Sequence, residues 1–383
     1  MKIAIDARML QYTRVGISVY TENLVIYLAK DFDIEINLIL VQYKEEINLF
    51  DNIPNVKCFY IAPGYDEYIK RELWELKNLS MFLNELDIDV YHSPNYYLPY
   101  FKKPRSAMVV TMYDASLYAV PQYYKFFHKF LGKIHMFFSS GVADKIIFGS
   151  QHAQSEFKKY LGKECSTKGK PIYIGVPQEI FTEKTILQED IDSVKKKFKI
   201  SGKYIIAIGS VHPRKNYERL IEVMGAHSLA EYSLIICGAV AWKSESIFEK
   251  ITHLKLSSRV QITGFIETED MKTLLKGAEA MVFPSLYEGF GIPPLEAFSL
   301  GVPVVASGTT SIPEVVGDAA VLFDPLSVED MREKIVSVVK DKELQNDLIE
   351  KGKKRLEFFS WEKCAKEHMS LYKEAYRHKK GNK

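Results

Sequence analysis

The chain has 383 residues, of which 47% are hydrophobic and 26% charged, and its formal net charge is +2. These values fit a globular protein large enough for two domains, and they argue against fibrous, low-complexity and dedicated nucleic-acid-binding classes. The four cysteines, at positions 58, 165, 237 and 364, lack the paired spacing of a disulfide framework or a zinc site. We therefore expect a cytoplasmic protein.

The first ten residues, MKIAIDARML, read as a strand, because Asp6 and Arg8 interrupt the apolar core that a signal peptide needs. A loop ending at Gly16 follows, after which apolar residues recur at helical spacing from Ile17. No later run reaches the roughly 18 apolar residues that span a bilayer, so any membrane association would be peripheral.

Short apolar runs that end in small or polar residues then alternate with helix-like segments, which predicts two parallel sheets with crossover helices. The runs are EINLILV, VYHSP, AMVVTMYD and KIIFGS in the first half, and KYIIAIGS, SLIICGAV, RVQITGF, AMVFPS and VPVVAS in the second. Prolines and a glycine place the linker near Pro177 to Lys184, so we predict domains at residues 1–178 and 184–359. A last helix over 360–378, with Ser360 as its N-cap, has no strand after it and is expected to cross back to the first domain.

Residues 91–170 are basic, with 12 Lys and Arg against 4 Asp and Glu, and within them the segment 121–138 has a helical pattern. Tyr124, Phe127, Leu131, Ile134 and Phe138 are spaced three and four apart, beside a row formed by lysines 125, 129 and 133. An ordinary core-packing helix explains this pattern. The three additional phenylalanines at 126, 130 and 137 favour a second interpretation, a peripheral contact with an anionic membrane.

The sequence PSLYEGFGIPPLEAFSLGVPVVAS, which begins at Pro284, predicts a phosphate-sized turn before a helix. Gly289 and Gly291 permit a tight turn, and the two prolines that follow suit the first turn of a helix. The N-terminus of that helix would attract a phosphate, with Glu288 before the turn and Glu296 inside the helix. By composition alone, an ordinary αβ unit with a surface glutamate is the more common interpretation, because turn glycines are frequent.

A second cluster, GSVHPRKN at residues 209–216, follows the apolar run KYIIAIGS. Arg214 and Lys215 therefore lie at the carboxyl edge of a strand, where open α/β sheets bind ligands, and such a pair suits a diphosphate. An isolated pair of this kind is more often a solvated surface. The sequence Asp-Ile-Asp at 87–89 fits a metal-binding pattern, but it directly precedes a predicted strand and reads as a turn.

These motifs occur in an order that resembles the retaining GT-B glycosyltransferases of family 4. The resemblance is strong from about residue 201 to 326 and rests on GSVHPRKN, TGFIETEDM, PSLYEGFGIPPLEA, GVPVVAS and SIPEVVGDAAVLFDP. DARMLQYTRVGISVYTENL and DVYHSPNYYLP resemble the amino-terminal part of mannosyltransferase-like members. The implied fold is two Rossmann-like domains with parallel sheets that face a central cleft.

The resemblance also implies roles for residues at matching positions. Arg214 and Lys215 would hold the donor diphosphate, Glu296 the ribose hydroxyls, and Glu288 the transferred sugar. Further donor contacts would come from Gly209, Ser210, Ile266 and the backbone amides of Phe290, Gly291 and Ile292. The loop at Gly16 would approach the phosphate and the acceptor. The reaction would need no metal.

One position departs from the family pattern. Many relatives have a histidine at the strand end that reads TMYDAS here, and this chain has Tyr113 followed by Asp114. Asp114 then becomes the expected polar group in the cleft. Tyr113 and His92 are also expected to contact the donor. His92 also has a structural interpretation, which the sequence leaves open.

We therefore expect a hexosyltransferase that moves mannose from GDP-mannose to a glycan or lipid-linked acceptor, at the inner face of the membrane. The donor is inferred from the amino-terminal resemblance. A nucleotide-sugar epimerase or a non-catalytic sugar-nucleotide-binding protein would share the architecture, and both remain alternatives.

Overall fold

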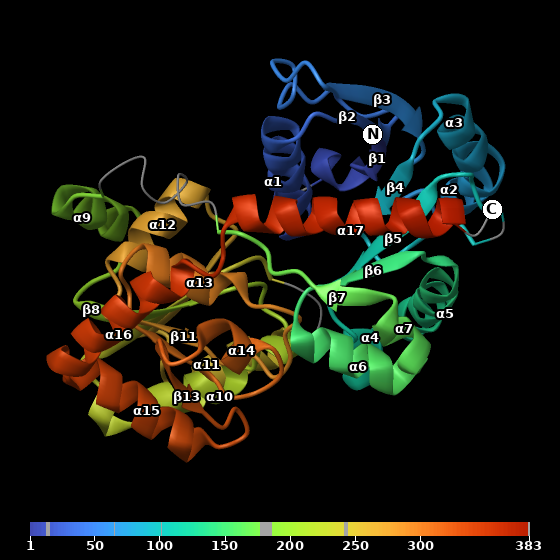
Figure 1. The fold of residues 1–383 in the computed structure, drawn as a ribbon. Helices are drawn as coiled ribbons and strands as arrows, with labels where there is room; N and C mark the ends of the chain where they lie inside the picture. Colours follow the sequence, from blue (N-terminus) through green and yellow to red (C-terminus); the bar gives the residue numbers. More distant parts are fainter. Residues whose placement is uncertain (13–15, 65, 101, 177–185, 241–243, 382–383) are drawn as a thin grey trace. The chain divides into compact units, whose positions relative to one another are not determined.

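The computed structural model describes residues 1–12, 16–64, 66–100, 102–176, 186–240 and 244–381 (Figure 1). The chain forms two compact units. Unit 1 comprises Met1–Gly175 with Phe359–Lys383, and unit 2 comprises Val176–Phe358. The linker predicted near Pro177 to Lys184 lies outside the described residues. Each unit is a parallel sheet surrounded by helices, which confirms the predicted α/β class.

Unit 1 contains a seven-stranded sheet with the order β3-β2-β1-β4-β5-β6-β7, and every pairing is parallel. Its strands are β1 (Lys2–Asp6), β2 (Glu35–Val41), β3 (Val56–Ala62), β4 (Val90–Ser93), β5 (Ala107–Met112), β6 (Lys145–Phe148) and β7 (Gly169–Pro171). Its helices are η1 (Arg8–Gln11), α1 (Gly16–Asp31), α2 (Tyr68–Trp74), the π-helix η2 (Glu75–Leu79), α3 (Ser80–Glu85), α4 (Ser116–Ala119), η3 (Pro121–Tyr123), α5 (Phe126–Val142), α6 (Gln151–Leu161), α7 (Lys163–Thr167) and α17 (Trp361–Gly381).

The last helix, α17, is part of unit 1 although it follows unit 2 in sequence. Its first turn is capped by Ser360, whose hydroxyl accepts the backbone N–H of Lys363 at 3.1 Å. One face of α17 is buried against α1 and against β4, β5 and β6 (Figure 1). The chain thus returns to cover a sheet whose strands are buried on both faces, as parallel strands require.

Unit 2 contains a six-stranded parallel sheet with the order β10-β9-β8-β11-β12-β13. Its strands are β8 (Lys203–Ile208), β9 (Tyr232–Cys237), β10 (Val260–Gly264), β11 (Ala280–Phe283), β12 (Val304–Ser307) and β13 (Ala320–Phe323). Its helices are α9 (Gln188–Lys197), η4 (Pro213–Lys215), α10 (Tyr217–Met224), η5 (His227–Leu229), α11 (Glu245–His253), α12 (Thr268–Lys276), α13 (Ile292–Ser299), α14 (Ile312–Val316), α15 (Val328–Lys340) and α16 (Lys342–Leu356).

Three strands have no counterpart among the predicted runs. β3 is an edge strand of mostly half-buried residues, and the exposed Lys57 interrupts its apolar pattern. β7 is only three residues long and begins at a glycine. β13 lies in SIPEVVGDAAVLFDP, a segment in which the sequence indicates a family motif and no separate strand. All three strands are at or beside sheet edges, where the hydrophobic signal is weakest.

Helix α5 differs from the predicted amphipathic pattern. Its buried side is formed by small, polar and sulfur-containing residues at 132, 135, 136, 139 and 140, whereas Phe127 and Phe138 are exposed. The hydrophobic stripe read from the sequence is therefore not the face that packs on the sheet. Among the described residues, no helix combines the length and apolarity needed to cross a bilayer.

Candidate active site

The candidate site of unit 2 lies where neighbouring strands end. β8 and β11 are adjacent and parallel, yet β8 is followed in sequence by β9 on its other side. The chain therefore leaves β8 and β11 toward opposite sides of the sheet, and such a switch point at the carboxyl edge is where open α/β sheets bind ligands. The segment after β8 contains Arg214 and Lys215, and the segment after β11 contains Glu288.

Arg214 and Lys215 converge on the carboxylate of Glu288. Lys215 Nζ is 2.6 Å from Glu288 Oε1, and Arg214 Nη1 is 3.0 Å from Glu288 Oε2. Lys215 and Glu288 are only 8% and 9% exposed, so the ion pair is largely removed from water. Each carboxylate oxygen thus has its own cation, and two positive charges are concentrated at one point of the sheet edge.

The charges of this cluster fix its protonation. Burial alone would raise the pKa of Glu288, but the charges of Lys215 and Arg214 outweigh burial and lower the pKa to about 2. Glu288 is therefore ionised at neutral pH. Burial lowers the pKa of Lys215, and the charge of Glu288 opposes that effect. The carboxylate thus helps to keep a buried lysine charged.

Backbone hydrogen bonds join the two segments that carry the cluster. The N–H of Leu286 donates to the carbonyl of Arg214 at 2.9 Å, and the Arg214 guanidinium donates to the carbonyl of Tyr287. The hydroxyl oxygen of Ser311, which follows β12, lies 2.9 and 3.0 Å from the carbonyl oxygens of Glu288 and Phe290, and its one hydrogen is shared between them. Three strand ends therefore hold Arg214 and Glu288 in place, as a preorganised site requires.

The predicted turn and helix after Glu288 are present. Gly291 has a φ of 108°, which favours glycine, and it precedes α13, whose first turn contains Pro293 and Pro294. Ile292 begins the helix and Phe290 is buried beneath the turn. Glu296, half-buried on α13, has its pKa raised to about 7 by burial, against the opposing charge of Lys272.

The remaining predicted residues of unit 2 surround the same edge. Gly209 directly follows β8 and has a φ of 141°, and a Cβ there would lie 3.1 Å from Cε of Lys215. A side chain at this position would therefore crowd the lysine. Ser210 is exposed directly after it, and Ile266 is half-buried in the connection between β10 and α12.

In unit 1, His92 lies in β4 and is fully buried in a chain of hydrogen bonds. Its Nε2 is 2.8 Å from Thr111 Oγ1 and its Nδ1 is 2.7 Å from the Tyr372 hydroxyl. Thr111 Oγ1 lies 3.1 Å from the Tyr20 hydroxyl, which lies 2.5 Å from His368 Nε2. His368 Nδ1 lies 2.7 Å from the carbonyl of Cys364.

The carbonyl of Cys364, at the end of this series of hydrogen bonds, determines the direction of each bond in the series. Because a carbonyl only accepts, His368 Nδ1 donates to Cys364 and its Nε2 accepts from Tyr20. Thr111 then donates to Tyr20, His92 Nε2 donates to Thr111, and Tyr372 donates to His92 Nδ1. Both histidines are neutral, and burial lowers the pKa of His368 to about 4 and that of His92 well below its usual value. His92 thus fastens α17 to the sheet, and its contact with a donor stays a prediction.

The other predicted residues of unit 1 lie near the ends of β5 and the start of α1. Tyr113 directly follows β5 and is half-buried, and its ring packs edge-on against Tyr20 at 5.4 Å between centroids. The Asp114 carboxylate accepts the backbone N–H of Ser116 at 2.8 Å, which starts α4. Gly16 is the exposed first residue of α1. The sequence Asp-Ile-Asp at 87–89 forms the turn before β4, and Asp89 accepts the backbone N–H of Lys2 at 2.9 Å.

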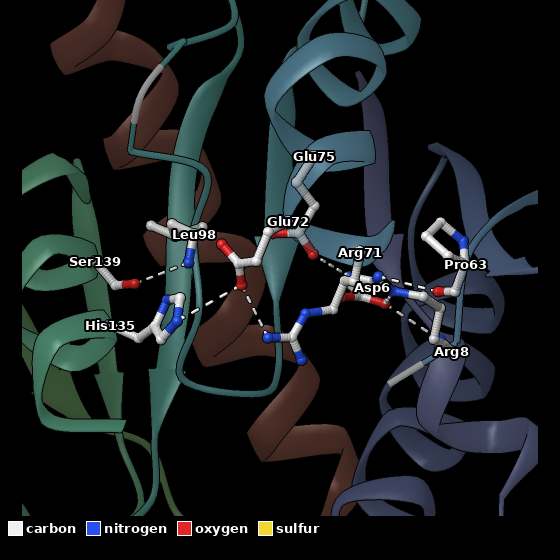
Figure 2. Close-up of polar contacts among 9 residues, drawn as sticks. All are labelled: Asp6, Arg8, Pro63, Arg71, Glu72, Glu75, Leu98, His135 and Ser139. Carbon is white, nitrogen blue, oxygen red and sulfur yellow. Dashed lines mark hydrogen bonds and ion pairs between the residues drawn. The ribbon is translucent and has the colours of Figure 1, made fainter. Parts of the chain in front are cut away.

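Sequence reasoning did not predict two groups of charged side chains in unit 1 (Figure 2). Arg8 forms ion pairs with Asp6 at 2.7 Å and with Glu75 at 2.8 Å, and burial raises the pKa of Glu75 despite the charge of Arg8. In the second group, Arg71 Nη2 and His135 Nε2 lie 2.9 and 3.6 Å from Glu72 Oε1. For the group around Arg8, the sequence signal was the presence of two charged residues, Asp6 and Arg8, within the otherwise apolar segment AIDAR.

The geometry of unit 2 has a definite chemical capacity. A guanidinium and an ammonium at a strand edge neutralise phosphate oxygens, and the adjacent carboxylate accepts hydrogen bonds from hydroxyl groups. A half-buried carboxyl on the next helix adds a second acceptor. These groups suit a ligand that combines phosphates with sugar hydroxyls.

Comparisons with known proteins agree with this capacity. A family model described as glycosyl transferases group 1 matches residues 188–355, which is most of unit 2. O-antigen chain mannosyltransferase B of Escherichia coli is 28% identical over 412 residues, an alignment that covers 97% of this chain and 100% of that protein. Serotype-specific mannosyltransferase WbdA of Escherichia coli is 32% identical over 237 residues, which is 60% of this chain and 28% of that protein.

Solved structures show the same fold across the whole chain. Sucrose-phosphate synthase from Thermosynechococcus elongatus superimposes with a TM-score of 0.77 at 16% identity, covering 97% of this chain and 98% of that one. Anabaena HepE, solved in complex with UDP and glucose, gives 0.74 at 18% identity, with the same coverage of both chains. The structures show the two-domain α/β fold of the GT-B class, and the family match and the mannosyltransferase relatives support a glycosyltransferase similar to the family 4 enzymes.

Proposed function

We propose that this glycosyltransferase moves mannose from GDP-mannose to a glycan or lipid-linked acceptor, with retention of the anomeric configuration. The observation that carries the proposal is the convergence of Arg214 and Lys215 on Glu288 at the carboxyl edge of β8 and β11. The mannosyl group is supported by the names of the relatives, an O-antigen chain mannosyltransferase and a serotype-specific mannosyltransferase. Retention rests on the family resemblance.

In this proposal Arg214 and Lys215 bind the donor diphosphate. The planar fork of the arginine matches two phosphate oxygens, and the lysine supplies a compact charge beside it. As the bond between the sugar and the phosphate breaks, negative charge grows on the departing diphosphate, and both cations stabilise it. These side chains supply the charge that a divalent ion provides in other transferases, so we propose a reaction without a metal cofactor.

Glu288 and Glu296 bind the hydroxyl groups of the donor. Glu288 is ionised next to the cations and accepts hydrogen bonds from the transferred sugar. Glu296 accepts from the ribose, and its pKa of about 7 makes that contact dependent on pH. The backbone amides of Phe290, Gly291 and Ile292 complete the phosphate site, with Gly209 and Ser210 beside them and Ile266 near the base.

Unit 1 contributes Gly16, Tyr113 and Asp114 to substrate binding in this proposal. Asp114 replaces the histidine contact of many relatives, and Tyr113 lies next to it at the end of β5. We further propose the cytoplasm as the compartment, because all four cysteines are free and three of them are buried.

An assay of nucleotide-sugar turnover tests the proposed reaction. The protein is incubated with GDP-mannose, UDP-glucose or UDP-N-acetylglucosamine, each with and without a mannose-terminated oligosaccharide as acceptor. We expect release of GDP that depends on the acceptor, and an α-linked product by NMR. Conversion of the sugar nucleotide without acceptor would identify an epimerase, and binding without turnover would identify a non-catalytic protein.

A further inference from the structure

Helix α5 presents five phenylalanines to solvent. Phe126, Phe127 and Phe130 in its first half are 75%, 69% and 53% exposed, and Phe137 and Phe138 near its end are 58% and 45% exposed. Five of the eight exposed phenylalanines in the described part of the chain therefore lie on this one helix. Single exposed apolar residues are normal on a protein surface, but such a concentration marks an interaction site.

The opposite side of α5 explains why these rings face outward. The N–H of Leu98 donates to Ser139 Oγ at 2.9 Å, and His135 contacts the Glu72 carboxylate (Figure 2). The His135 ring also packs against the ring of Tyr97. Gly132 lets the helix approach closely, since a Cβ there would lie 2.4 Å from Cδ1 of Leu117. Polar bonds and a close helix contact thus fix α5 to unit 1, and the phenylalanines are left on the outside.

The charge along this helix is of one sign. The sequence contains no Asp or Glu between Asp114 and Asp144, whereas lysines occur at 125, 129 and 133. Lys125 is exposed, and the Lys129 ammonium lies 5.8 Å from the centroid of the Phe126 ring. Phe126 and Phe130 stack with centroids 6.4 Å apart. The surface therefore combines exposed aromatic rings with lysines, in a segment of the sequence that contains no acidic residue.

We propose that α5 lies in the surface of an anionic lipid bilayer, with its phenylalanines inserted between headgroups and its lysines at the phosphate level. Aromatic rings next to cations suit that environment, because burial of the rings and attraction to anionic lipid act together. A symmetric contact between two copies of the chain would set the same lysines against each other, and the like charges would oppose it. This surface is independent of the sugar-nucleotide site and of the proposed reaction.

Flotation of the full chain with lipid vesicles tests the proposal. We expect the parent protein to float with vesicles of equal parts phosphatidylglycerol and phosphatidylcholine. With vesicles of pure phosphatidylcholine, we expect it to stay at the bottom of the gradient. The variant Phe126→Ser/Phe127→Ser/Phe130→Ser should lose roughly 1,000-fold or more in partitioning, because each of the three buried phenylalanines contributes over tenfold. Lys125→Glu/Lys129→Glu/Lys133→Glu should lose on the order of 100-fold, at about 1 kcal/mol for each cation.

A matched control separates this surface from charge in general. The variant Lys196→Glu/Lys340→Glu/Lys354→Glu changes three exposed lysines of unit 2 by the same total charge, and we expect it to float like the parent. Thermal unfolding measures whether all variants are folded. We expect them to be, because the substituted phenylalanines and lysines lie at the surface. Failure of the parent to float on anionic vesicles would overturn the proposal, as would flotation of the phenylalanine variant at the parental level. A lipid-free dimer that the phenylalanine substitutions convert to monomer would also overturn it, by identifying a second copy as the occupant.

Discussion

The two units place polar residues in their sheets in different ways. In unit 2, Arg214, Lys215 and Glu288 come from two adjacent strand ends and meet in one cluster of charges. In unit 1, His92 and Tyr20 form a neutral chain of hydrogen bonds that joins α17 to the sheet. The two groups of polar residues therefore have different proposed roles. The charged edge of unit 2 binds ligand, and the polar interior of unit 1 stabilises the fold. Each of the following experiments tests one side of this comparison.

The largest effect is expected for the cations of unit 2. Arg214→Ala or Lys215→Ala removes stabilisation of the charge that develops on the leaving diphosphate, so kcat should fall on the order of 100-fold or more. Lys203→Ala serves as the control, because Lys203 is an exposed lysine at the opposite end of the same strand. Steady-state kinetics with saturating donor measures the effect. Activity within a few-fold of the parent for both variants would refute the assignment.

Glu288→Gln tests the carboxylate between those cations. If Glu288 contacts the transferred sugar, the substitution should lower kcat by roughly 100-fold, while the affinity for free GDP, which lacks that sugar, should change only a few-fold. Kinetics and calorimetry with GDP measure the two quantities separately. A large loss of GDP affinity at unchanged kcat would assign Glu288 to the nucleotide instead of the sugar.

The neutral chain of unit 1 predicts acid sensitivity. The folded-state pKa of His368 is about 4, below its unfolded value near 6.5, so the unfolded state binds more protons between these values. The contribution to stability is complete above pH 6.5 and is lost as the pH falls toward 4. From pH 7 to pH 5 we expect a loss of roughly 2 kcal/mol in the free energy of unfolding, at 1.4 kcal/mol for each pH unit below 6.5.

Denaturant unfolding of the parent and of His368→Gln between pH 5 and pH 7 measures this dependence. The variant is expected to be less stable at pH 7 and to show a flatter pH profile, because it lacks the titrating group. Parallel profiles for the two proteins would contradict a neutral buried histidine at this position.

The smallest effect concerns Glu296. Its pKa of about 7 means that the carboxylate, the form that accepts two ribose hydroxyls, is populated only as the pH rises through 7. GDP affinity should therefore increase between pH 6 and pH 8, and Glu296→Gln should reduce it about tenfold at pH 8 and less at pH 6. The phosphate of GDP titrates in a similar range, so the difference between parent and variant isolates the carboxyl. An equal ratio at both pH values would remove Glu296 from the ribose site.

The sequence was informative where hydrophobic runs and glycine or proline positions dominate. EINLILV corresponds to β2 in full, and the Gly291 turn with its two following prolines begins α13 as predicted. The convergence of Lys215 on Glu288 required knowledge of strand order, since 73 residues separate them in the chain. Only the adjacency of β8 and β11 brings their ends together.

Helix α5 shows why a hydrophobicity pattern is not sufficient. The core-packing interpretation placed Phe127 and Phe138 on the buried side, but Ser139 and His135 contact Leu98 and Glu72, which lie far away in sequence. Those contacts satisfy polar groups inside the unit and leave the aromatic side outward. The same holds for His92, whose partners Thr111 and Tyr372 come from β5 and α17. Long-range polar contacts of this kind have no local sequence signal.

The central claim is that Arg214 and Lys215 bind the diphosphate of the donor, and calorimetric titration with GDP and GMP tests it most directly. The two nucleotides share base and ribose and differ in one phosphate, so their affinity ratio measures what the extra phosphate contributes. We expect the parent to bind GDP at least about tenfold more tightly than GMP, and Arg214→Ala/Lys215→Ala to bind both within about twofold. An unchanged ratio in the variant, with the protein still folded, would contradict the claim.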